Sequence, residues 1–247
     1  MKRIIIDDVW KRFSIGTKRQ QRALEKVLSL LSGREPRKNF WALKSISFSA
    51  KAGEIIGLIG ENGSGKSTLL RIIAGIYEKD RGKIMVNGSI APLINLQAAL
   101  DLRLNVMDNI YLCCSIFGLK SKEIKERIKE IISFAGLQEF VNTKLYQLSS
   151  GMLVRLAFSI AIHSIVHKKP EILLLDEVME VGDEHYQNKC MKKIKELTKS
   201  GATVIIVSHD AKIIKENCKR IIWLDKGQII KDGGKEILYE YIKSNKK

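Results

Sequence analysis

A glycine-rich loop early in the chain constrains the possible fold more than any other feature of the sequence. It reads Gly60-Glu61-Asn62-Gly63-Ser64-Gly65-Lys66-Ser67 and matches the pattern GxxxxGK[ST]. An apolar run at 55–59 precedes the loop and a helical pattern at 67–74 follows it, which is the strand–loop–helix setting that this motif requires. The loop predicts a nucleoside-triphosphate site, against the alternative of a glycine-rich turn that binds nothing.

The physical reason lies in the backbone. Glycines allow successive N–H groups to converge on phosphate oxygens, and the following helix directs the positive end of its dipole at the same anion. We expect Lys66 to neutralise the β- and γ-phosphates and the Ser67 hydroxyl to bind Mg²⁺. The predicted nucleotide-binding residues of this segment are Gly60, Glu61, Asn62, Gly63, Ser64, Gly65, Lys66, Ser67 and Thr68.

The remaining hydrophobic pattern predicts an α/β protein. Apolar runs at 172–175 and 203–207 have no polar face, as in the central strands of a parallel sheet. Between about 108 and 167 the pattern is helical, with Ser121 expected to cap one helix and a second helix expected from about Met152 to Val166. Shorter strands are expected at 4–9, 45–49, 84–86, 220–224 and 228–231. The sequence therefore predicts one domain with a mostly parallel sheet, interrupted by a helical subdomain.

Two acidic residues, Asp176 and Glu177, end the apolar run at 172–175. Open α/β sheets bind ligands at the carboxyl ends of their strands, so these carboxylates are expected beside the phosphate loop. We expect Asp176 to hold Mg²⁺ through water, and Glu177 to orient and deprotonate the attacking water. The alternative is a solvated strand end, which the phosphate loop earlier in the chain disfavours.

Two weaker features complete the pattern. The turn Ser149-Ser150-Gly151 precedes a helix and could be a second anion-binding helix start that meets the γ-phosphate, or a plain helix cap. His209 follows the apolar run at 203–207 and could sense the γ-phosphate, although a histidine at a strand end is usually a surface residue. Their order and separations relative to Asp176 favour the functional reading of both.

With these four features, the sequence resembles the nucleotide-binding subunits of ABC transporters over essentially its whole length. Its signature has the form Ser-Ser-Gly-Met, where most ABC proteins have Leu-Ser-Gly-Gly-Gln. That form is characteristic of the ATPases of O-antigen, capsule and teichoic-acid exporters. The stretches that carry this closer resemblance are Phe40-Trp41-Ala42-Leu43-Lys44, Ser149-Ser150-Gly151-Met152 with Val154-Arg155-Leu156-Ala157-Phe158, and Asp176-Glu177-Val178 through Val181-Gly182-Asp183.

The resemblance implies a P-loop NTPase core with an antiparallel β subdomain and an inserted helical signature subdomain. It implies ATP and Mg²⁺ as ligands, and a head-to-tail homodimer that holds each ATP between the phosphate loop of one subunit and the signature turn of the other. Asp183 would belong to the D-loop. Separate integral-membrane permease subunits, indirect contact with a lipid-linked glycan, no nucleic-acid partner and a peripheral place on the cytoplasmic face of the cell membrane are also implied.

Three positions depart from the family pattern or match it loosely. Gln97 lies about where the family has a glutamine that binds Mg²⁺, although glycine is frequent there in this subfamily. Phe13 is our choice, over Trp41, for the aromatic residue that stacks on adenine. Glu180 replaces the usual alanine, and a carboxylate there could raise the pKa of Glu177 by like-charge repulsion or could point away.

Charge is concentrated near the N-terminus. The chain has 43 basic and 27 acidic residues, a net charge of +16. The insertion between the first two predicted strands, residues 11–44, contributes about half of this excess, and apolar residues at 24, 27, 28 and 31 predict a short amphipathic helix in it. The insertion is expected to serve transport, by contact with anionic headgroups or with the pyrophosphate of a lipid carrier, or else to serve only solubility. A soluble ABC ATPase acting on nucleic acid or ribosomes is disfavoured, because the chain has one nucleotide domain and no sustained heptads. An ABC ATPase of another transporter class, such as an importer subunit, is disfavoured by the Ser-Ser-Gly-Met signature and by the basic insertion.

Other features indicate the compartment. No apolar run approaches the roughly 18 residues needed to cross a bilayer, and the acidic start is unlike a signal peptide, so we expect a soluble intracellular protein. The four cysteines lack metal-knuckle spacing and are expected to be reduced and buried. Because the sequence ends at Lys247, we expect no C-terminal carbohydrate-binding domain.

Overall fold

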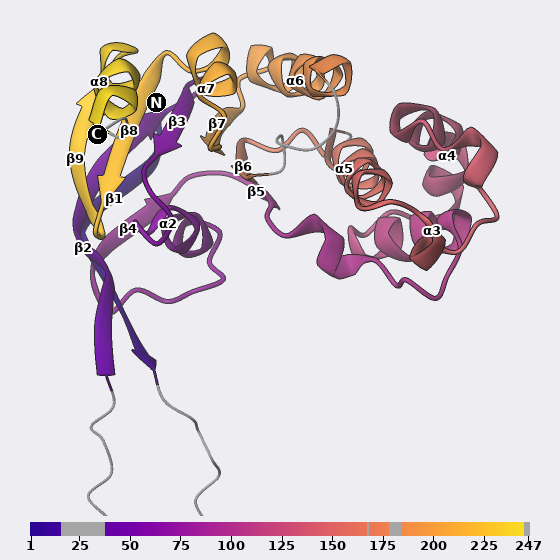
Figure 1. The fold of residues 1–247 in the computed structure, drawn as a ribbon, viewed down its shortest axis with the longest axis horizontal. Coiled ribbons are helices and arrows are strands. Elements are labelled where there is room, and N and C mark those ends of the chain that lie inside the picture. The colour runs from indigo at the N-terminus through magenta and orange to yellow at the C-terminus, as the bar shows by residue number, and fades with distance from the viewer. Residues whose placement is uncertain (16–37, 167, 178–183, 245–247) are drawn as a thin grey trace, which may run out of the picture.

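The structure, a computed structural model, describes residues 1–15, 38–166, 168–177 and 184–244. At its centre is a six-stranded sheet in the order β5-β6-β7-β3-β8-β9 (Figure 1). Neighbouring strands run parallel except β8 and β9, which are antiparallel. The predicted α/β class with a mostly parallel sheet is confirmed. The strands are β3 Ile55–Ile59, β5 Ile90–Leu93, β6 Ile172–Asp176, β7 Thr203–Val207, β8 Arg220–Asp225 and β9 Gln228–Gly233.

Each central strand contributes side chains to two apolar layers, because successive side chains of a strand point to opposite faces. Leu173, Leu175 and Ile206 pack in the layer beneath α5 Ser150–Val166, α6 Glu184–Lys199, α7 Ala211–Asn217 and α8 Glu236–Ser244. Leu174 and Ile205 pack on the other face, against α2 Lys66–Ile73 and a second sheet. This double burial explains the uninterrupted apolar runs of these strands in the sequence.

The second sheet is three-stranded and antiparallel, in the order β2-β1-β4. Its strands are β1 Lys2–Ile15, β2 Lys38–Lys51 and β4 Arg81–Val86. The prediction of short strands at 4–9 and 45–49 is wrong in length, and the ends of the predicted insertion 11–44 are strand. Basic residues such as Lys11 and Arg12 continue β1 because an antiparallel sheet can leave one face in water. Residues 16–37, including the helix expected around 24–31, lie outside the described part of the chain.

The helical part has a core of its own. Its helices are α3 Val106–Ile116, α4 Ser121–Ala135 and α5, and Figure 1 shows α3 and α4 to one side of the sheets. Ile110, Ile131 and Leu156 are fully buried where the three helices meet. Ser121 is not the cap of α4: Lys120 takes that position, and its backbone N–H donates to the Glu123 carboxylate at 2.7 Å, since an acid three residues on can supply the acceptor.

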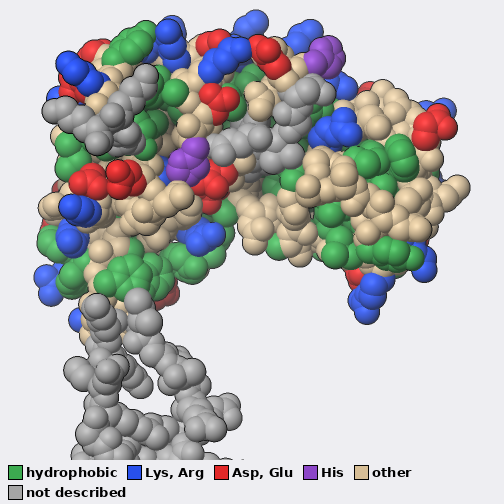
Figure 2. Space-filling model, viewed as in Figure 1, with side chains coloured by type: hydrophobic (Ala, Val, Ile, Leu, Met, Phe, Trp, Pro, Cys, Tyr) green, Lys and Arg blue, Asp and Glu red, His purple; other side chains and the backbone are tan. Residues whose placement is uncertain are grey.

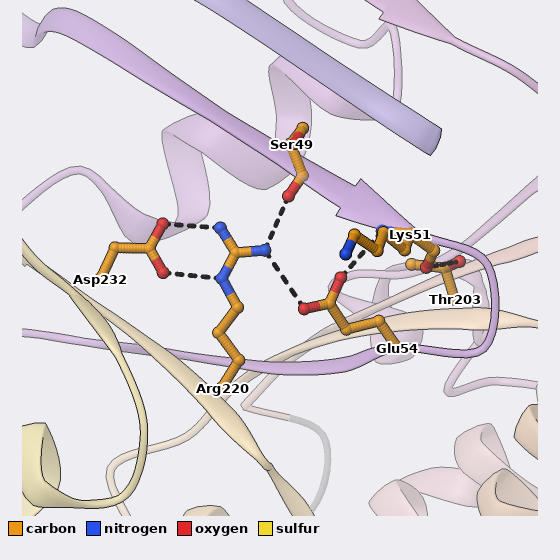
Figure 3. Close-up of polar contacts among 6 residues, drawn as sticks. All are labelled: Ser49, Lys51, Glu54, Thr203, Arg220 and Asp232. Carbon is orange, nitrogen blue, oxygen red and sulfur yellow. Dashed lines mark hydrogen bonds and ion pairs between the residues drawn. The ribbon is translucent and has the colours of Figure 1, made fainter. Parts of the chain in front are cut away.

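A single arginine ties the far ends of several strands together (Figure 3). The guanidinium of Arg220, at the start of β8, donates to both carboxylate oxygens of Asp232 on β9, at 2.7 and 2.6 Å. It also donates to the Ser49 carbonyl on β2, at 2.7 Å, and to Glu54, just before β3, at 3.2 Å. Each of the three nitrogens Nε, Nη1 and Nη2 thus donates at least one hydrogen bond, and the bonds to Asp232 contribute most to raising the pKa of Arg220.

Two expectations about the whole chain can be compared with the described residues. Among them, no helix has both the length and the apolar character that crossing a membrane requires. All four cysteines are free and buried, as expected, and burial raises the pKa of Cys113 to about 11 and that of Cys190 to about 12.

Candidate nucleotide site

Three strand ends bring the predicted site residues together. In the central sheet, Val207 on β7 lies opposite Leu58 on β3 and opposite Asp176 on β6. The phosphate loop begins two residues beyond Leu58, and His209 lies two residues beyond Val207. The loop, the carboxylates and the histidine therefore leave the sheet at one edge, which is where open α/β sheets bind their ligands.

The phosphate loop can be built only with glycine at its tightest points. Gly60 and Gly65 have positive φ angles of 148° and 108°. A Cβ atom on Gly60 would lie 2.1 Å from the Leu224 carbonyl oxygen, and one on Gly65 would lie 2.7 Å from the Ala42 carbonyl oxygen. Backbone from β8 and β2 thus lies against the loop at these two glycines, where a side chain would not fit.

The side chain of Lys66 folds back over the phosphate loop. Its ammonium group donates to the carbonyl oxygens of Gly60 and Glu61, at 2.7 and 2.9 Å, and the residue is 5% exposed. The Ser64 hydroxyl is also buried and has no hydrogen-bond partner among the residues that the structure describes. A buried cation and a buried polar atom without a protein partner suit a loop that encloses an anion, so the residues present fit a phosphate ligand.

Ser67 and Asp176 form the side of the site that fits Mg²⁺. The Ser67 hydroxyl donates to Asp176 Oδ1 at 3.0 Å. Burial raises the pKa of Asp176, with a further increase from Glu177, while the Ser67 hydrogen bond and the charges of Arg71 and Lys66 oppose it. No cluster of three His, Cys, Asp or Glu side chains suited to a metal occurs among the described residues. Ser67 and Asp176 provide one hydroxyl and one carboxylate oxygen, and Mg²⁺ is usually held by one or two carboxylates together with substrate phosphates and water.

A cavity of about 430 Å³ opens beside this pair of residues, between α2, the end of β6 and the start of α5. Gln97, in the 3₁₀ helix Leu96–Ala99, lines it together with Ser67 and Asp176, so the residue predicted as a metal ligand faces the same space. Arg71, one helical turn beyond Ser67, also lines this cavity, and the sequence motifs did not single it out.

Glu177 has an unusual backbone. Its φ angle is +56°, a left-handed conformation that a glutamate rarely adopts, and its backbone N–H donates to the Val207 carbonyl at 3.0 Å. Its carboxylate lies 2.8 Å from Nε2 of His209. Glu177 lines both this cavity and the one at the phosphate loop. In Figure 2, acidic side chains lie beside a histidine in the middle of the visible face, above a hollow between the sheet part and the helical part.

Aromatic side chains form the other end of the site. Phe13 and Phe40 line a cavity of about 270 Å³ together with Ala42 and the phosphate loop. Their ring centroids are 5.9 Å apart, and Tyr77 packs edge-on against Phe13 with centroids 5.5 Å apart. Trp41 does not line this cavity. Phe40 is not among the site residues expected from the sequence. It lies opposite Phe13 in the β1–β2 pairing, and only that register identifies it as part of the site.

The signature turn lies apart from these two cavities, whose linings do not include it. Ser149 and Ser150 are exposed, and the Ser149 hydroxyl accepts from the Met152 backbone N–H at 3.3 Å, so it caps the start of α5. The space around Gly151 is open, because a Cβ atom on this residue would meet nothing within 4 Å. Asp183 and Glu180 lie outside the described residues.

A phosphate loop, a strand-terminal Asp–Glu pair and a facing histidine on a mostly parallel sheet define a nucleotide-binding protein of the P-loop class. Comparison with protein-family models is more specific: the model described as "ABC transporter" matches residues 43–180. The chain belongs to the ABC transporter family, and the part that it represents is the ATP-binding cassette.

Individual relatives resemble the chain over most of its length. An O-antigen export system ATP-binding protein, RfbB of Klebsiella pneumoniae, is 36% identical over 89% of this chain and 86% of its own length. A teichoic acids export ATP-binding protein, TagH of Lactococcus lactis, is 40% identical over 88% of this chain, which spans 46% of that longer protein. The resemblance to O-antigen and teichoic-acid export ATPases inferred from the motifs is confirmed.

Solved structures agree on the fold. A dimeric structure of MJ0796, a bacterial ABC transporter cassette, superposes with a TM-score of 0.73 at 25% identity, covering 94% of this chain and 98% of that one. A second MJ0796 structure, described as a dimeric post-hydrolysis state bound to ADP and Pi, has the same TM-score at 24% identity.

Proposed function

We propose that this protein is the ATP-hydrolysing subunit of an ABC exporter that moves a lipid-linked polysaccharide, of the O-antigen, capsule or teichoic-acid type, across the cytoplasmic membrane. One observation carries the proposal. In a chain whose relatives are O-antigen and teichoic-acid export ATP-binding proteins, a hydrogen-bonded Ser67–Asp176 pair and a Glu177–His209 pair lie at the edge of an intact phosphate loop.

The roles of the residues follow from their chemistry. The loop and Lys66 hold the phosphates, and Ser67, Asp176 and Gln97 would hold Mg²⁺, which neutralises charge on the phosphate oxygens when bound. Phe13 and Phe40 hold the base by stacking. Glu177 accepts a proton from the attacking water while the water oxygen forms a bond to the γ-phosphorus. The bond between the γ-phosphorus and the oxygen that bridges it to the β-phosphate breaks, and ADP leaves. His209 positions the Glu177 carboxylate and the γ-phosphate.

Assembly follows from the exposed signature turn. Ser149, Ser150 and Gly151 are available to a second copy, so we propose a head-to-tail homodimer in which they meet the ATP held by the other subunit, with Asp183 near the same interface. Two separate permease subunits would carry the glycan, and the ATPase would sit peripherally on the cytoplasmic face of the membrane. The MJ0796 cassette, which was solved as a dimer, supports the dimeric part of this proposal.

The test is polysaccharide display on cells that lack this protein. Wild-type protein should restore display and co-purify with a membrane permease, and Glu177→Gln at equal abundance should co-purify without restoring display. Restoration by Glu177→Gln would contradict an ATP-driven role. Normal display in the deletion strain, with transport of another substrate lost, would contradict polysaccharide as the cargo.

A further inference from the structure

The face of the β1–β2–β4 sheet that points away from the nucleotide cavity carries a cluster of tryptophans and arginines. Trp10 on β1 and Trp41 on β2 meet edge to face, with ring centroids 5.3 Å apart. Two guanidinium groups lie over the Trp41 ring: that of Arg12 at 5.5 Å from the centroid and that of Arg81, on β4, at 5.7 Å. One indole thus holds two like charges close together, in three strands whose register is fixed by backbone pairing.

The side-chain donors of these two arginines make no hydrogen bond with the residues that the structure describes. Within that part of the chain, neither the Arg12 nor the Arg81 guanidinium has an ion pair. Both lie over the Trp41 ring, and the charge of Arg81 also contributes, after two hydrogen bonds from Ser45 and Trp10, to lowering the pKa of Asp8. Arg220 provides the contrast, because its guanidinium donates four hydrogen bonds to two carboxylates and a carbonyl (Figure 3). Stacking fixes the planes of Arg12 and Arg81 while leaving their donors free, which lowers the entropy cost of binding a planar or tetrahedral oxyanion.

The acidic side chains near the cluster are occupied by other partners. Asp8 accepts hydrogen bonds from Trp10 Nε1, at 2.8 Å, and from the Ser45 hydroxyl, at 2.6 Å. Asp80 accepts from the Arg12 backbone N–H, at 2.7 Å, and lies 3.5 Å from the Lys11 ammonium group. These carboxylates hold the indole and the strand in place, and they reduce the local positive charge without pairing with either guanidinium.

We propose that Arg12 and Arg81, held on Trp41, form a binding site for a phosphate group. The chemistry suits a phosphodiester or pyrophosphate, since each guanidinium can donate two parallel hydrogen bonds to phosphate oxygens. The site is separate from the nucleotide site: Phe13 and Phe40 line the nucleotide cavity, and their strand neighbours Arg12 and Trp41 point to the opposite face. The phosphate can come from the headgroup of a membrane lipid or from a soluble phosphate compound, and the proposal does not depend on the transport role.

Tryptophan fluorescence can report on this site directly, because the chain has three tryptophans and two of them are in the cluster. Trp223→Phe removes the third, and Lys66→Ala in the same chain weakens uptake of the probe by the phosphate loop. This background variant is titrated with inorganic pyrophosphate at constant ionic strength. In parallel it is mixed with vesicles of phosphatidylcholine, with and without phosphatidylglycerol. The same titrations follow in Arg12→Gln/Arg81→Gln, and in the matched control Lys192→Gln/Lys195→Gln on α6, which loses the same charge elsewhere.

We expect a saturable change in emission with at least one probe, weakened about tenfold or more by Arg12→Gln/Arg81→Gln and little changed in the α6 control. Arg12→Lys/Arg81→Lys should bind with intermediate strength, because lysine keeps the charge and loses the planar fork. A response to phosphatidylglycerol vesicles alone assigns the site to membrane lipid, and a response to pyrophosphate assigns it to a soluble or linking phosphate. No response to either probe overturns the proposal, as does equal loss of binding in the α6 control, which would reduce the effect to net charge.

Discussion

At the scale of single residues, Glu177 combines a left-handed backbone with a carboxylate that contacts His209. The motif places an acidic pair at the end of an apolar strand, and that alone predicted the neighbourhood of Asp176 and the phosphate loop. It could not predict a left-handed glutamate with φ +56° and a carboxylate 2.8 Å from His209. A non-glycine residue in that conformation costs about 1–3 kcal/mol, and such strain concentrates at functional sites.

The first prediction concerns this carboxylate. Glu177→Gln keeps the size of the side chain and one acceptor oxygen but removes the base, so ATP hydrolysis should fall by about 10²–10⁴-fold. ATP affinity should be unchanged, and with ATP and Mg²⁺ the variant should shift from monomer to dimer in sizing chromatography. Phosphate release and elution volume measure the two effects. Hydrolysis by the variant at the wild-type rate would show that Glu177 is not the base.

The second prediction concerns the buried cation of the loop. Lys66→Ala removes two hydrogen bonds to loop carbonyls, at 2.7 and 2.9 Å, along with the ammonium group that should meet the phosphates. Affinity for a fluorescent ATP analogue should fall by about tenfold or more, because hydrogen bonds to charged groups contribute roughly 1.5–3 kcal/mol each. Lys192→Ala on the exposed side of α6 is the matched control and should bind like wild type. Unchanged affinity in Lys66→Ala would place the phosphates elsewhere.

At the scale of elements, the β1–β2 hairpin was the hardest to predict. The hydrophobic pattern predicted strands only at 4–9 and 45–49. The charged residues beyond these ranges resemble a loop when no partner strand is known. Their pairing is set by long-range contacts such as Phe13 with Phe40 and Arg12 with Trp41. The central strands, by contrast, are buried on both faces. Their sequences are therefore uninterrupted apolar runs, which can be recognised without knowing the partner strand.

The third prediction belongs to this hairpin. Phe13→Ala and Phe40→Ala should each weaken ATP binding, since stacking of a base on an aromatic ring contributes about 1–3 kcal/mol. The affinity for inorganic triphosphate should not change, because triphosphate has no base to stack on the rings. Trp41→Phe, on the opposite face of the same strand, should bind ATP normally. Isothermal titration of all three variants with both ligands is the measurement, and a parallel loss for triphosphate would indicate general unfolding of the hairpin.

At the scale of the whole molecule, the sequence predicted the parts better than their placement. The phosphate loop, the strand-terminal acids and the signature turn each have a local pattern, whereas the position of α3 and α4 beside the sheets depends on packing between segments far apart in the chain. Only the structure shows that Ser149 and Ser150 are exposed and line neither cavity at the phosphate loop. The exposed position of this turn is the basis for the proposed contact with a second subunit.

The last prediction concerns the basic segment that joins β1 to β2, whose residues 16–37 lie outside the described structure. Its sequence carries six basic and two acidic side chains, and it follows directly from strands that border the nucleotide cavity without supplying its phosphate-binding groups. Replacing Arg19, Arg22 and Lys26 together with glutamine should leave the ATPase activity of the isolated subunit nearly unchanged. If each cation contributes about 1 kcal/mol near an anionic surface, membrane affinity should fall by roughly a hundredfold and polysaccharide display should decrease.

The control of equal charge is a triple variant on α6, in which Lys192, Lys193 and Lys195 are changed together to glutamine. Normal display with the first triple variant at wild-type abundance would contradict a transport role for the segment, and loss of basal ATPase activity would place these residues in the nucleotide site.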